Sequence, residues 1–192
     1  MIKMNFRRHI FDKLVQWKTS SNAKPLILRG ARQVGKTTLV RSFVESYTHF
    51  IELNLEKSED ASLVERSNSV QELVNFLALK NEISPKDFPH TLLFIDEIQE
   101  SEKAISFLRY FYEELPELNV IAAGSLLEHT LKKTKNYPVG RINYLYLFPL
   151  NFQEYFEAQG KNNLLERFRN VPVDDIAHEL LMKEFHTYCI IG

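Results

Sequence analysis

One loop limits the folds open to this chain more than any other part of its sequence. Residues 30–37 read Gly-Ala-Arg-Gln-Val-Gly-Lys-Thr, which matches the phosphate-loop pattern of two glycines separated by four residues and followed by Lys and Ser or Thr. A short apolar run at residues 25–29 precedes the loop, and apolar residues at helical spacing follow Gly35. The pattern therefore predicts a strand, a loop that wraps an anion and a helix, which together begin a parallel α/β sheet.

Short apolar runs alternate with helical periods along the rest of the chain. Further strands are predicted at residues 50–55, 92–95, 120–123 and 142–148. The second and third of these runs are uninterrupted, as expected of strands covered on both faces, and the first alternates like an edge strand. Residues 62–80 and 102–115 have helical spacing. We therefore predict a three-layer α/β core with a parallel sheet over residues 25–150.

Helical segments are expected on either side of this core. Residues 1–24 are predicted to form an N-terminal helical segment, and residues 151–192 the beginning of a helical, winged-helix-like lid. Asn151 and Glu154 have the spacing of a capping box, and Gly160 is placed to end the helix that it starts.

Composition excludes several classes of protein. Lys and Arg number 24 against 25 Asp and Glu, so the net charge of -1 provides no global attraction to nucleic acid or anionic lipid. No run approaches the roughly 20 apolar residues of a membrane-spanning helix, and the N-terminus lacks the apolar core of a signal peptide. The single cysteine, Cys189, cannot form an internal disulfide. We therefore expect a cytoplasmic protein that makes no membrane contact.

The residue types in the loop explain how it would bind a nucleotide. Glycines let the backbone approach phosphate oxygens, and backbone N–H groups at the start of a helix attract the anion. Lys36 is expected to reach the β and γ phosphates, and the Thr37 hydroxyl to ligate Mg²⁺. The predicted nucleotide-binding residues are Gly30, Gln33, Val34, Gly35, Lys36, Thr37 and Thr38.

Two carboxylates follow the apolar run at residues 92–95. Asp96 and Glu97 would stand at the carboxyl end of a strand, where open α/β sheets bind their ligands. Asp96 is predicted to hold Mg²⁺ with Thr37, and Glu97 to polarise the water that attacks the γ-phosphate. The alternative interpretation is a pair of solvated acids that open a loop.

Four segments together carry a family resemblance. The segments are GARQVGKT, LLFIDEIQE, YFYEELPELNVIAAGSLLE and PVGRINYLYLFPLNFQEYF. They are similar to the bacterial and archaeal branch of AAA+ P-loop ATPases, in which a C-terminal domain of unknown function usually follows. The resemblance extends from about residue 7 to the end of the chain. It implies the strand order 5-1-4-3-2, together with ATP and Mg²⁺ as ligands.

The resemblance also implies roles for two residues outside the loop. Ser125 corresponds to the sensor-1 position after the fourth strand, and Arg141 to an arginine finger that acts on a neighbouring subunit of a homo-oligomer. Ser125 also has a structural interpretation as a helix cap with Glu128, and Arg141 as a salt-bridge partner. The resemblance further implies that the chain stops inside its lid, as in a truncated form, before a sensor-2 arginine.

The expected activity is Mg²⁺-dependent ATP hydrolysis coupled to conformational change, with Lys36, Glu97, Ser125 and Arg141 as catalytic residues. One alternative is a regulatory switch or interaction module that binds ATP with little turnover. A small-molecule kinase is disfavoured because Glu97 favours attack by water, and a GTPase because no Asn-Lys-x-Asp motif is present. The basic cluster Lys132, Lys133 and Lys135 is either a nucleic-acid contact or the basic end of a helix. The client, protein or nucleic acid, stays open.

Overall fold

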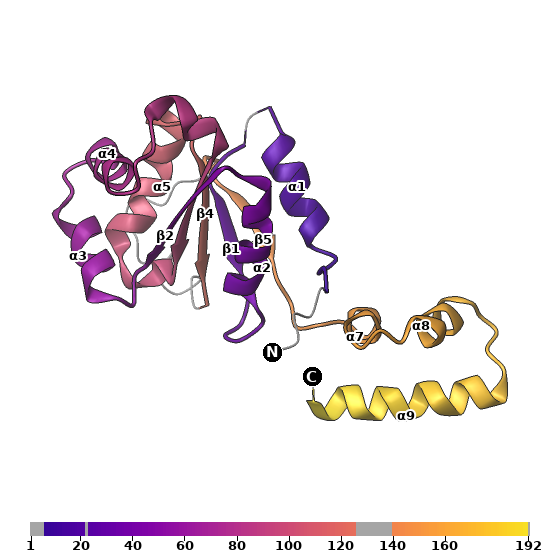
Figure 1. Cartoon of the computed structure of the whole chain (residues 1–192). Coiled ribbons are helices and arrows are strands. Elements are labelled where there is room, and N and C mark those ends of the chain that lie inside the picture. The colour runs from indigo at the N-terminus through magenta and orange to yellow at the C-terminus, as the bar shows by residue number, and fades with distance from the viewer. Residues whose placement is uncertain (1–5, 22, 126–139, 192) are drawn as a thin grey trace. The chain divides into compact units, whose positions relative to one another are not determined.

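Five parallel strands form the central sheet of residues Phe11–Leu147. They are β1 (Leu26–Arg29), β2 (His49–Asn54), β3 (Thr91–Asp96), β4 (Asn119–Gly124) and β5 (Asn143–Tyr146). Their spatial order is β2-β3-β4-β1-β5 (Figure 1), which is the predicted order 5-1-4-3-2 read from the opposite edge. The computed structural model describes residues 6–21, 23–125 and 140–191, and within them it confirms the parallel α/β fold.

The burial of each strand follows its place in the sheet. Every residue of the inner strand β3 is buried, as are all residues of the central strand β4 after Asn119. The edge strand β2 alternates between buried and half-buried residues, and no residue of the other edge strand, β5, is fully buried. The uninterrupted apolar runs therefore lie at the centre of the sheet, as their sequence predicts.

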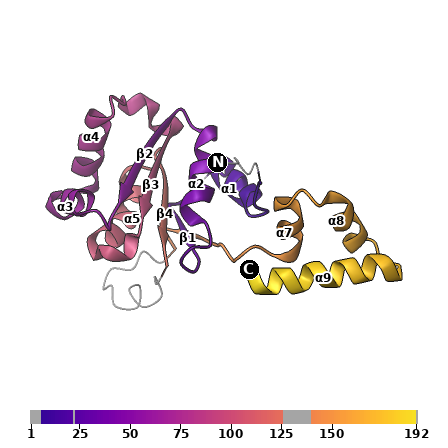
Figure 2. The same ribbon diagram turned by 60° about the horizontal axis from the view of Figure 1, so that its bottom comes forward.

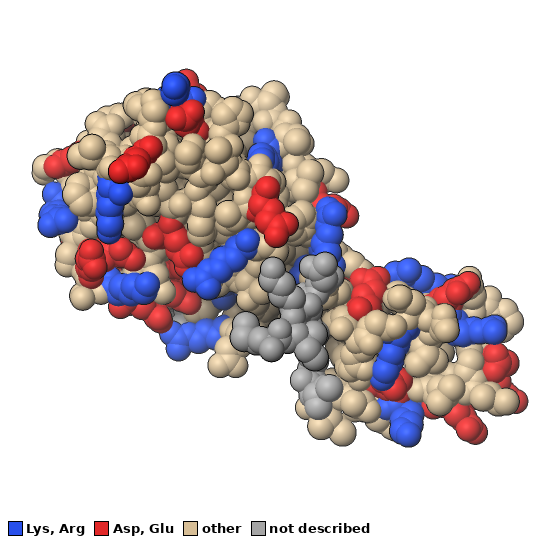
Figure 3. Space-filling model, viewed as in Figure 1, with Lys and Arg blue, Asp and Glu red and all other residues tan. Residues whose placement is uncertain are grey.

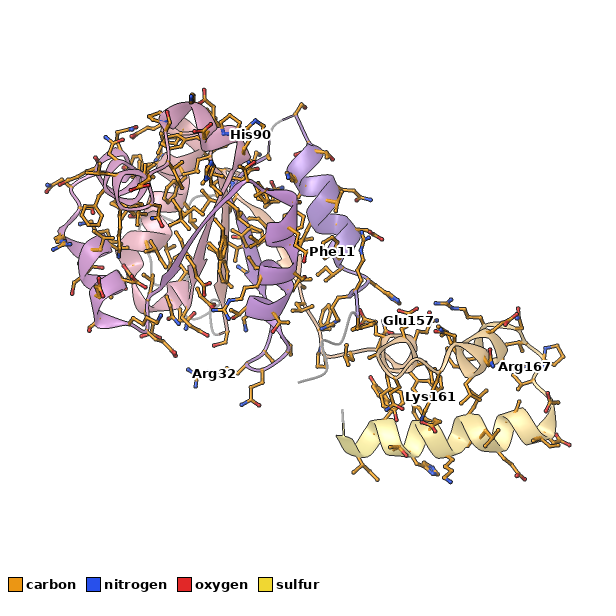
Figure 4. All side chains as sticks on the ribbon, in the orientation of Figure 1. Phe11, Arg32, His90, Glu157, Lys161 and Arg167 are labelled. Carbon is orange, nitrogen blue, oxygen red and sulfur yellow. The ribbon has the colours of Figure 1, made fainter. Side chains whose placement is uncertain are left out.

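Helices cover both faces of this sheet (Figures 1 and 2). The helices α1 (Phe11–Thr19) and α2 (Lys36–Phe43) lie on one face, where Phe11 packs edge-on against Phe43 with 5.5 Å between ring centroids (Figure 4). The opposite face is covered by α3 (Ser58–Arg66), α4 (Val70–Lys80) and α5 (Glu102–Glu114). Their apolar residues join the inner residues of the strands in the largest hydrophobic cluster of the described chain.

Residues 62–80, which have helical spacing in the sequence, belong to two separate helices, α3 and α4. The N–H of Ser67 closes α3 on the carbonyl of Leu63, and the Ser69 hydroxyl accepts a hydrogen bond from the N–H of Glu72 to begin α4. A serine side chain that satisfies an otherwise unpaired N–H favours a new helix start over a continuous helix. Short 3₁₀ helices are η1 (Val44–Ser46), η2 (Pro85–His90) and η3 (Ile98–Glu100).

The described residues of Met1–Ile10 and Phe148–Gly192 form a second unit. Its helices are α7 (Phe152–Ala158), α8 (Asn162–Arg169) and α9 (Asp175–Ile191). The capping box of Asn151 and Glu154 is present as predicted, and Glu154 also accepts hydrogen bonds from the Arg8 side chain and the His9 N–H. Phe152 is the centre of an aromatic core shared by the three helices, with Tyr155, Phe156, Phe168, Phe185 and Tyr188.

Charges of both signs are interspersed on the face shown in Figure 3, in keeping with the net charge of -1. Among the helices that the structure describes, none combines the length and the apolar character that a membrane crossing requires. The basic cluster Lys132, Lys133 and Lys135 lies outside the described residues, as does Glu128, the expected capping partner of Ser125.

Candidate functional site

The glycine-rich loop joins β1 to α2, as the sequence predicts. Gly35 at the start of α2 has a φ of 92°, and Gln33 has a φ of 65°, so the loop uses left-handed backbone at two positions. Gly30 is required for a different reason, because a Cβ at this position would stand 2.3 Å from the carbonyl oxygen of Leu147. The first glycine thus allows close packing of the loop on the segment after β5, and the second allows the left-handed turn.

Lys36 is folded back onto its own loop. Its Nζ donates hydrogen bonds to the carbonyl oxygens of Gly30 at 3.0 Å and Ala31 at 2.8 Å, and only 6% of the residue is exposed. Burial lowers the pKa of Lys36, while the negative charges of Glu97 and Asp96 oppose that change. The cation is therefore close to two carboxylates in a partly desolvated position.

Asp96 joins the end of β3 to the start of α2. The Thr37 hydroxyl donates a 2.7 Å hydrogen bond to its Oδ2, and the N–H of Glu97 donates to its Oδ1 at 3.0 Å. Burial raises the pKa of Asp96, and these two hydrogen bonds oppose the rise. Sequence reasoning predicted that Thr37 and Asp96 share a site, and the structure brings their side chains into contact.

A cavity of about 390 Å³ lies over this loop. Its lining residues come from the loop, the start of α2 and the end of β3, and they are Arg32, Gln33, Gly35, Lys36, Thr37, Thr38 and Glu97. Of the predicted binding residues, Gly30 and Val34 do not line it: Gly30 supplies a carbonyl to Lys36, and Val34 packs close to Gly30. Asp96 is not among the lining residues, but it is bonded to Thr37, which is.

Ser125 immediately follows β4, between the ends of β3 and β1 in the sheet. In the register of these strands Arg29 is opposite Gly124, so Ser125 stands at the edge that carries the loop and the two acids. Its hydroxyl oxygen is buried and has no hydrogen-bond partner among the residues that the structure describes. A buried hydroxyl of this kind is available to a donor or acceptor brought into the site.

Arg141 precedes β5 and does not line the cavity. Its guanidinium is ion-paired with Glu113 of α5, which also accepts hydrogen bonds from Arg109 at 3.0 and 3.1 Å. Within one chain, Arg141 is therefore a salt-bridge partner, which is one of the two roles considered for it from the sequence. Both arginines lower the pKa of Glu113.

Two contributions to the site were missed by sequence reasoning. Arg32, which received no role from the sequence, lines the cavity and projects from the loop with its side chain 70% exposed (Figure 4). Gln99, in the short helix η3, donates a 2.6 Å hydrogen bond to Glu97. The two-residue spacing of Glu97 and Gln99 does not predict that their side chains meet, because this contact depends on the local backbone conformation.

The donor set fits a magnesium nucleotide. A hydroxyl and a carboxylate are hard oxygen ligands of the kind that Mg²⁺ prefers, and here they lie within hydrogen-bond distance of each other. Beside them a lysine and the N-terminus of α2 face the cavity, which suits the negative charge of phosphate groups. Binding, orientation of a metal and activation of water are the chemical operations that this arrangement can support.

Comparison with known protein families gives a match over the same part of the chain. A family model described as AAA domain matches residues 22–156, which contain the loop, the acids after β3, Ser125 and Arg141. No curated protein matches the chain. The family match thus includes every residue of the site described above.

Proposed function

The chain belongs to the AAA domain family, and we propose that its site binds ATP with Mg²⁺ and hydrolyses it. The observation that carries the proposal is the 2.7 Å hydrogen bond from Thr37 to Asp96, because Thr37 lines the same cavity as Lys36 and Glu97. AAA domains in general bind nucleotide, and this bond joins the two side chains from which a magnesium site would be made.

Each residue in the proposal performs one operation. The backbone N–H groups at the start of α2 bind phosphate oxygens, and the Nζ of Lys36 pairs with the β and γ phosphates. Thr37 and Asp96 hold Mg²⁺, which when bound neutralises charge on the phosphates. Glu97 accepts a proton from, or orients, the water that attacks the γ-phosphate. Gly30 and Gly35 keep the backbone in the shape that these contacts need.

An ATP-dependent switch is the second candidate, and the position of Lys36 favours it. Its Nζ is bonded to the carbonyls of Gly30 and Ala31, so a nucleotide must compete with these hydrogen bonds. Likewise, Thr37 and Asp96 must exchange their mutual bond for metal ligation. Binding would therefore change the contacts of the loop, which is the change that a nucleotide-gated switch would transmit.

Ser125 and Arg141 have proposed roles that depend on a second ligand or subunit. The hydroxyl of Ser125 is buried and has no hydrogen-bond partner within residues 6–21, 23–125 and 140–191, which supports a role in orienting the attacking water. Arg141 is proposed to leave Glu113 and to reach the γ-phosphate of a neighbouring copy, where an arginine stabilises transition-state charge. This role requires a homo-oligomer.

The helices α7 to α9 are proposed as the beginning of a lid, in line with the expectation for residues 151–192. Their shared aromatic core around Phe152 supports this proposal, because it allows the three helices to act as one body.

Titration calorimetry with Mg·ATP and single-turnover hydrolysis test the proposal together. Heat of binding is expected for the unaltered chain and for Lys80→Ala, an exposed lysine on α4, and is expected to disappear in Lys36→Ala. Hydrolysis is expected to fall by about 100-fold or more in Glu97→Gln, because general-base contributions are of that size. Equal hydrolysis rates in the unaltered chain and Glu97→Gln favour the switch, and the absence of binding heat contradicts both functions.

A further inference from the structure

The side chain of Gln99 contacts the carboxylate of Glu97. Its Nε2 donates a 2.6 Å hydrogen bond to Glu97 Oε2, and a longer contact of 3.4 Å joins the same nitrogen to Glu100. Glu97 itself has a φ of 53° and a ψ of 46°, in the left-handed region that residues other than glycine adopt infrequently. The carboxylate is therefore directed by an unusual backbone conformation and by one amide.

The backbone that carries Gln99 is anchored on both sides. Ile98 is fully buried in the main hydrophobic cluster, and Ser101 is 4% exposed. The Ser101 hydroxyl donates to Glu65 at 2.6 Å and accepts from the N–H of Ala104 at 3.1 Å, which starts α5. A side chain on such a fixed turn needs little further ordering to direct a neighbour.

The carbonyl oxygen of the Gln99 side-chain amide has no hydrogen-bond partner in the described parts of the chain. This atom, Oε1, is buried, yet nothing among residues 6–21, 23–125 and 140–191 donates a hydrogen bond to it. An unsatisfied buried acceptor costs stability, and such groups in folded proteins often mark a functional position. Here the acceptor belongs to the amide that contacts Glu97, so it is available to a donor that enters with the ligand.

We propose that Gln99 is a positioning residue for hydrolysis: its amide holds the Glu97 carboxylate in the orientation that faces the attacking water. The inference rests on the proposed function, because it assigns Glu97 the contact with that water. A donor N–H fixes which carboxylate oxygen is free, and a displacement of about 1 Å in a reacting group can cost about 100-fold in rate. Gln99 thereby acts on the chemical step and not on nucleotide binding.

Gln99→Met tests this role, because methionine has a similar length and lacks the amide. Single-turnover hydrolysis is expected to fall by about 10- to 100-fold, with the Kd for Mg·ATP within about twofold of the unaltered value. Gln71→Met, on the exposed surface of α4, is the matched control and should change neither quantity. In the Glu97→Gln background, Gln99→Met should lower the residual rate by less than about threefold, because the two residues act as one unit.

A measurement without nucleotide examines the contact itself. In the ¹⁵N spectrum, the side-chain amide resonance of Gln99 is identified by its loss in Gln99→Met. Glu97→Ala is expected to move this resonance and to leave that of Gln71 in place. Thermal unfolding of each variant accompanies the spectra. If Gln99→Met proves unfolded, the Gln99 side-chain amide is assigned from triple-resonance spectra of the unaltered chain, so that the test needs only the unaltered chain and Glu97→Ala.

The possible failures are distinguishable. Three results overturn the role of Gln99 and leave the ATPase proposal standing. The first is a hydrolysis rate in Gln99→Met equal to that of the unaltered chain, and the second is a loss of nucleotide affinity as large as the loss of rate. The third is that Gln99→Met lowers the rate as much in the Glu97→Gln background as in the unaltered chain. An unmoved Gln99 resonance in Glu97→Ala overturns that role as well. Absence of hydrolysis in the unaltered chain, in contrast, overturns the function and the positioning role together.

Discussion

The hydroxyl of Thr37 and the carboxylate of Asp96 are joined by a 2.7 Å hydrogen bond that links the first turn of α2 to the end of β3. The two residues are far apart in the sequence. In the sheet, β4 lies between β3 and β1, the strand that precedes the loop and α2, so the bond links segments that follow two non-adjacent strands. Because Asp96 is only 5% exposed, the hydroxyl is one of the few groups that stabilise its charge. The same pair has the oxygen chemistry of a magnesium site.

Replacing Thr37 tests whether this pair binds the metal. Thr37→Val keeps the shape of the side chain and removes the hydroxyl, so the affinity for Mg·ATP is expected to fall by about 10- to 100-fold, the range given by a hydrogen bond or ligand contact to a charged group. The affinity for ATP in EDTA should change by less than about threefold. Thr37→Ser retains the hydroxyl and should preserve the magnesium effect. Calorimetry with and without Mg²⁺ measures both; an equal loss in EDTA contradicts the metal role.

Asp96 should make stability depend on pH. Burial raises its folded-state pKa above 3.8, so in the interval between the two values the folded chain holds a proton that the unfolded chain has lost. The contribution of Asp96 to the free energy of unfolding is therefore fully present below pH 3.8 and is lost as the pH rises through the folded pKa. On acidification through this interval, the unaltered chain should gain stability relative to Asp96→Asn. Urea unfolding of both proteins across the pH series measures the difference, and a difference that is constant with pH contradicts the prediction.

Gly30 and Gly35 should respond differently to alanine. At Gly30 the new Cβ would stand 2.3 Å from the backbone oxygen of Leu147, which cannot rotate away, so a loss of about 1–3 kcal/mol is expected from overpacking. At Gly35 nothing lies within 4 Å, and the cost is that of a positive φ alone, about 1 kcal/mol. Chemical denaturation of the two variants should rank Gly30→Ala as the less stable. The opposite order would show that the loop moves away from Leu147.

The sequence predicted the features that depend on local patterns, and it missed several that depend on contacts between distant residues. The uninterrupted run at residues 92–95 predicted a buried strand, and a parallel sheet then places Asp96 at the same edge as the loop after β1. The strand order came from the family resemblance, because periodicity does not specify which strands are neighbours. The break between α3 and α4 was missed because Ser67 and Ser69 are neither glycine nor proline, and apolar residues at helical spacing lie on both sides.

Within the site, the residues that sequence reasoning missed depend on backbone geometry and on distant packing. Gln99 reaches Glu97 because Glu97 has a left-handed φ, and no periodic pattern records that conformation. The need for glycine at position 30 comes from Leu147, which is distant in the chain and adjacent only in the folded sheet. Contacts of this kind follow from the tertiary structure, whereas the phosphate loop is a local pattern.

Arg141 supplies a prediction about assembly. If it acts on the γ-phosphate of a neighbouring copy, Arg141→Ala should lower the hydrolysis rate by about 1000-fold, the lower range for an arginine finger, and leave nucleotide affinity nearly unchanged. Arg109→Ala is the matched control, since Arg109 contacts the same Glu113 from within α5 and should keep the rate within about threefold.

Mixing separates action between copies from action within one chain. Arg141→Ala has an intact Glu97, and Glu97→Gln has an intact Arg141, so a mixed oligomer contains some interfaces with both residues. Equimolar mixing of the two inactive variants should restore a measurable part of the hydrolysis rate, because the arginine of one copy completes the site of the other. Activity should then rise with protein concentration. If the mixture stays inactive while the unaltered chain hydrolyses ATP at a rate independent of concentration, Arg141 is only the salt-bridge partner of Glu113.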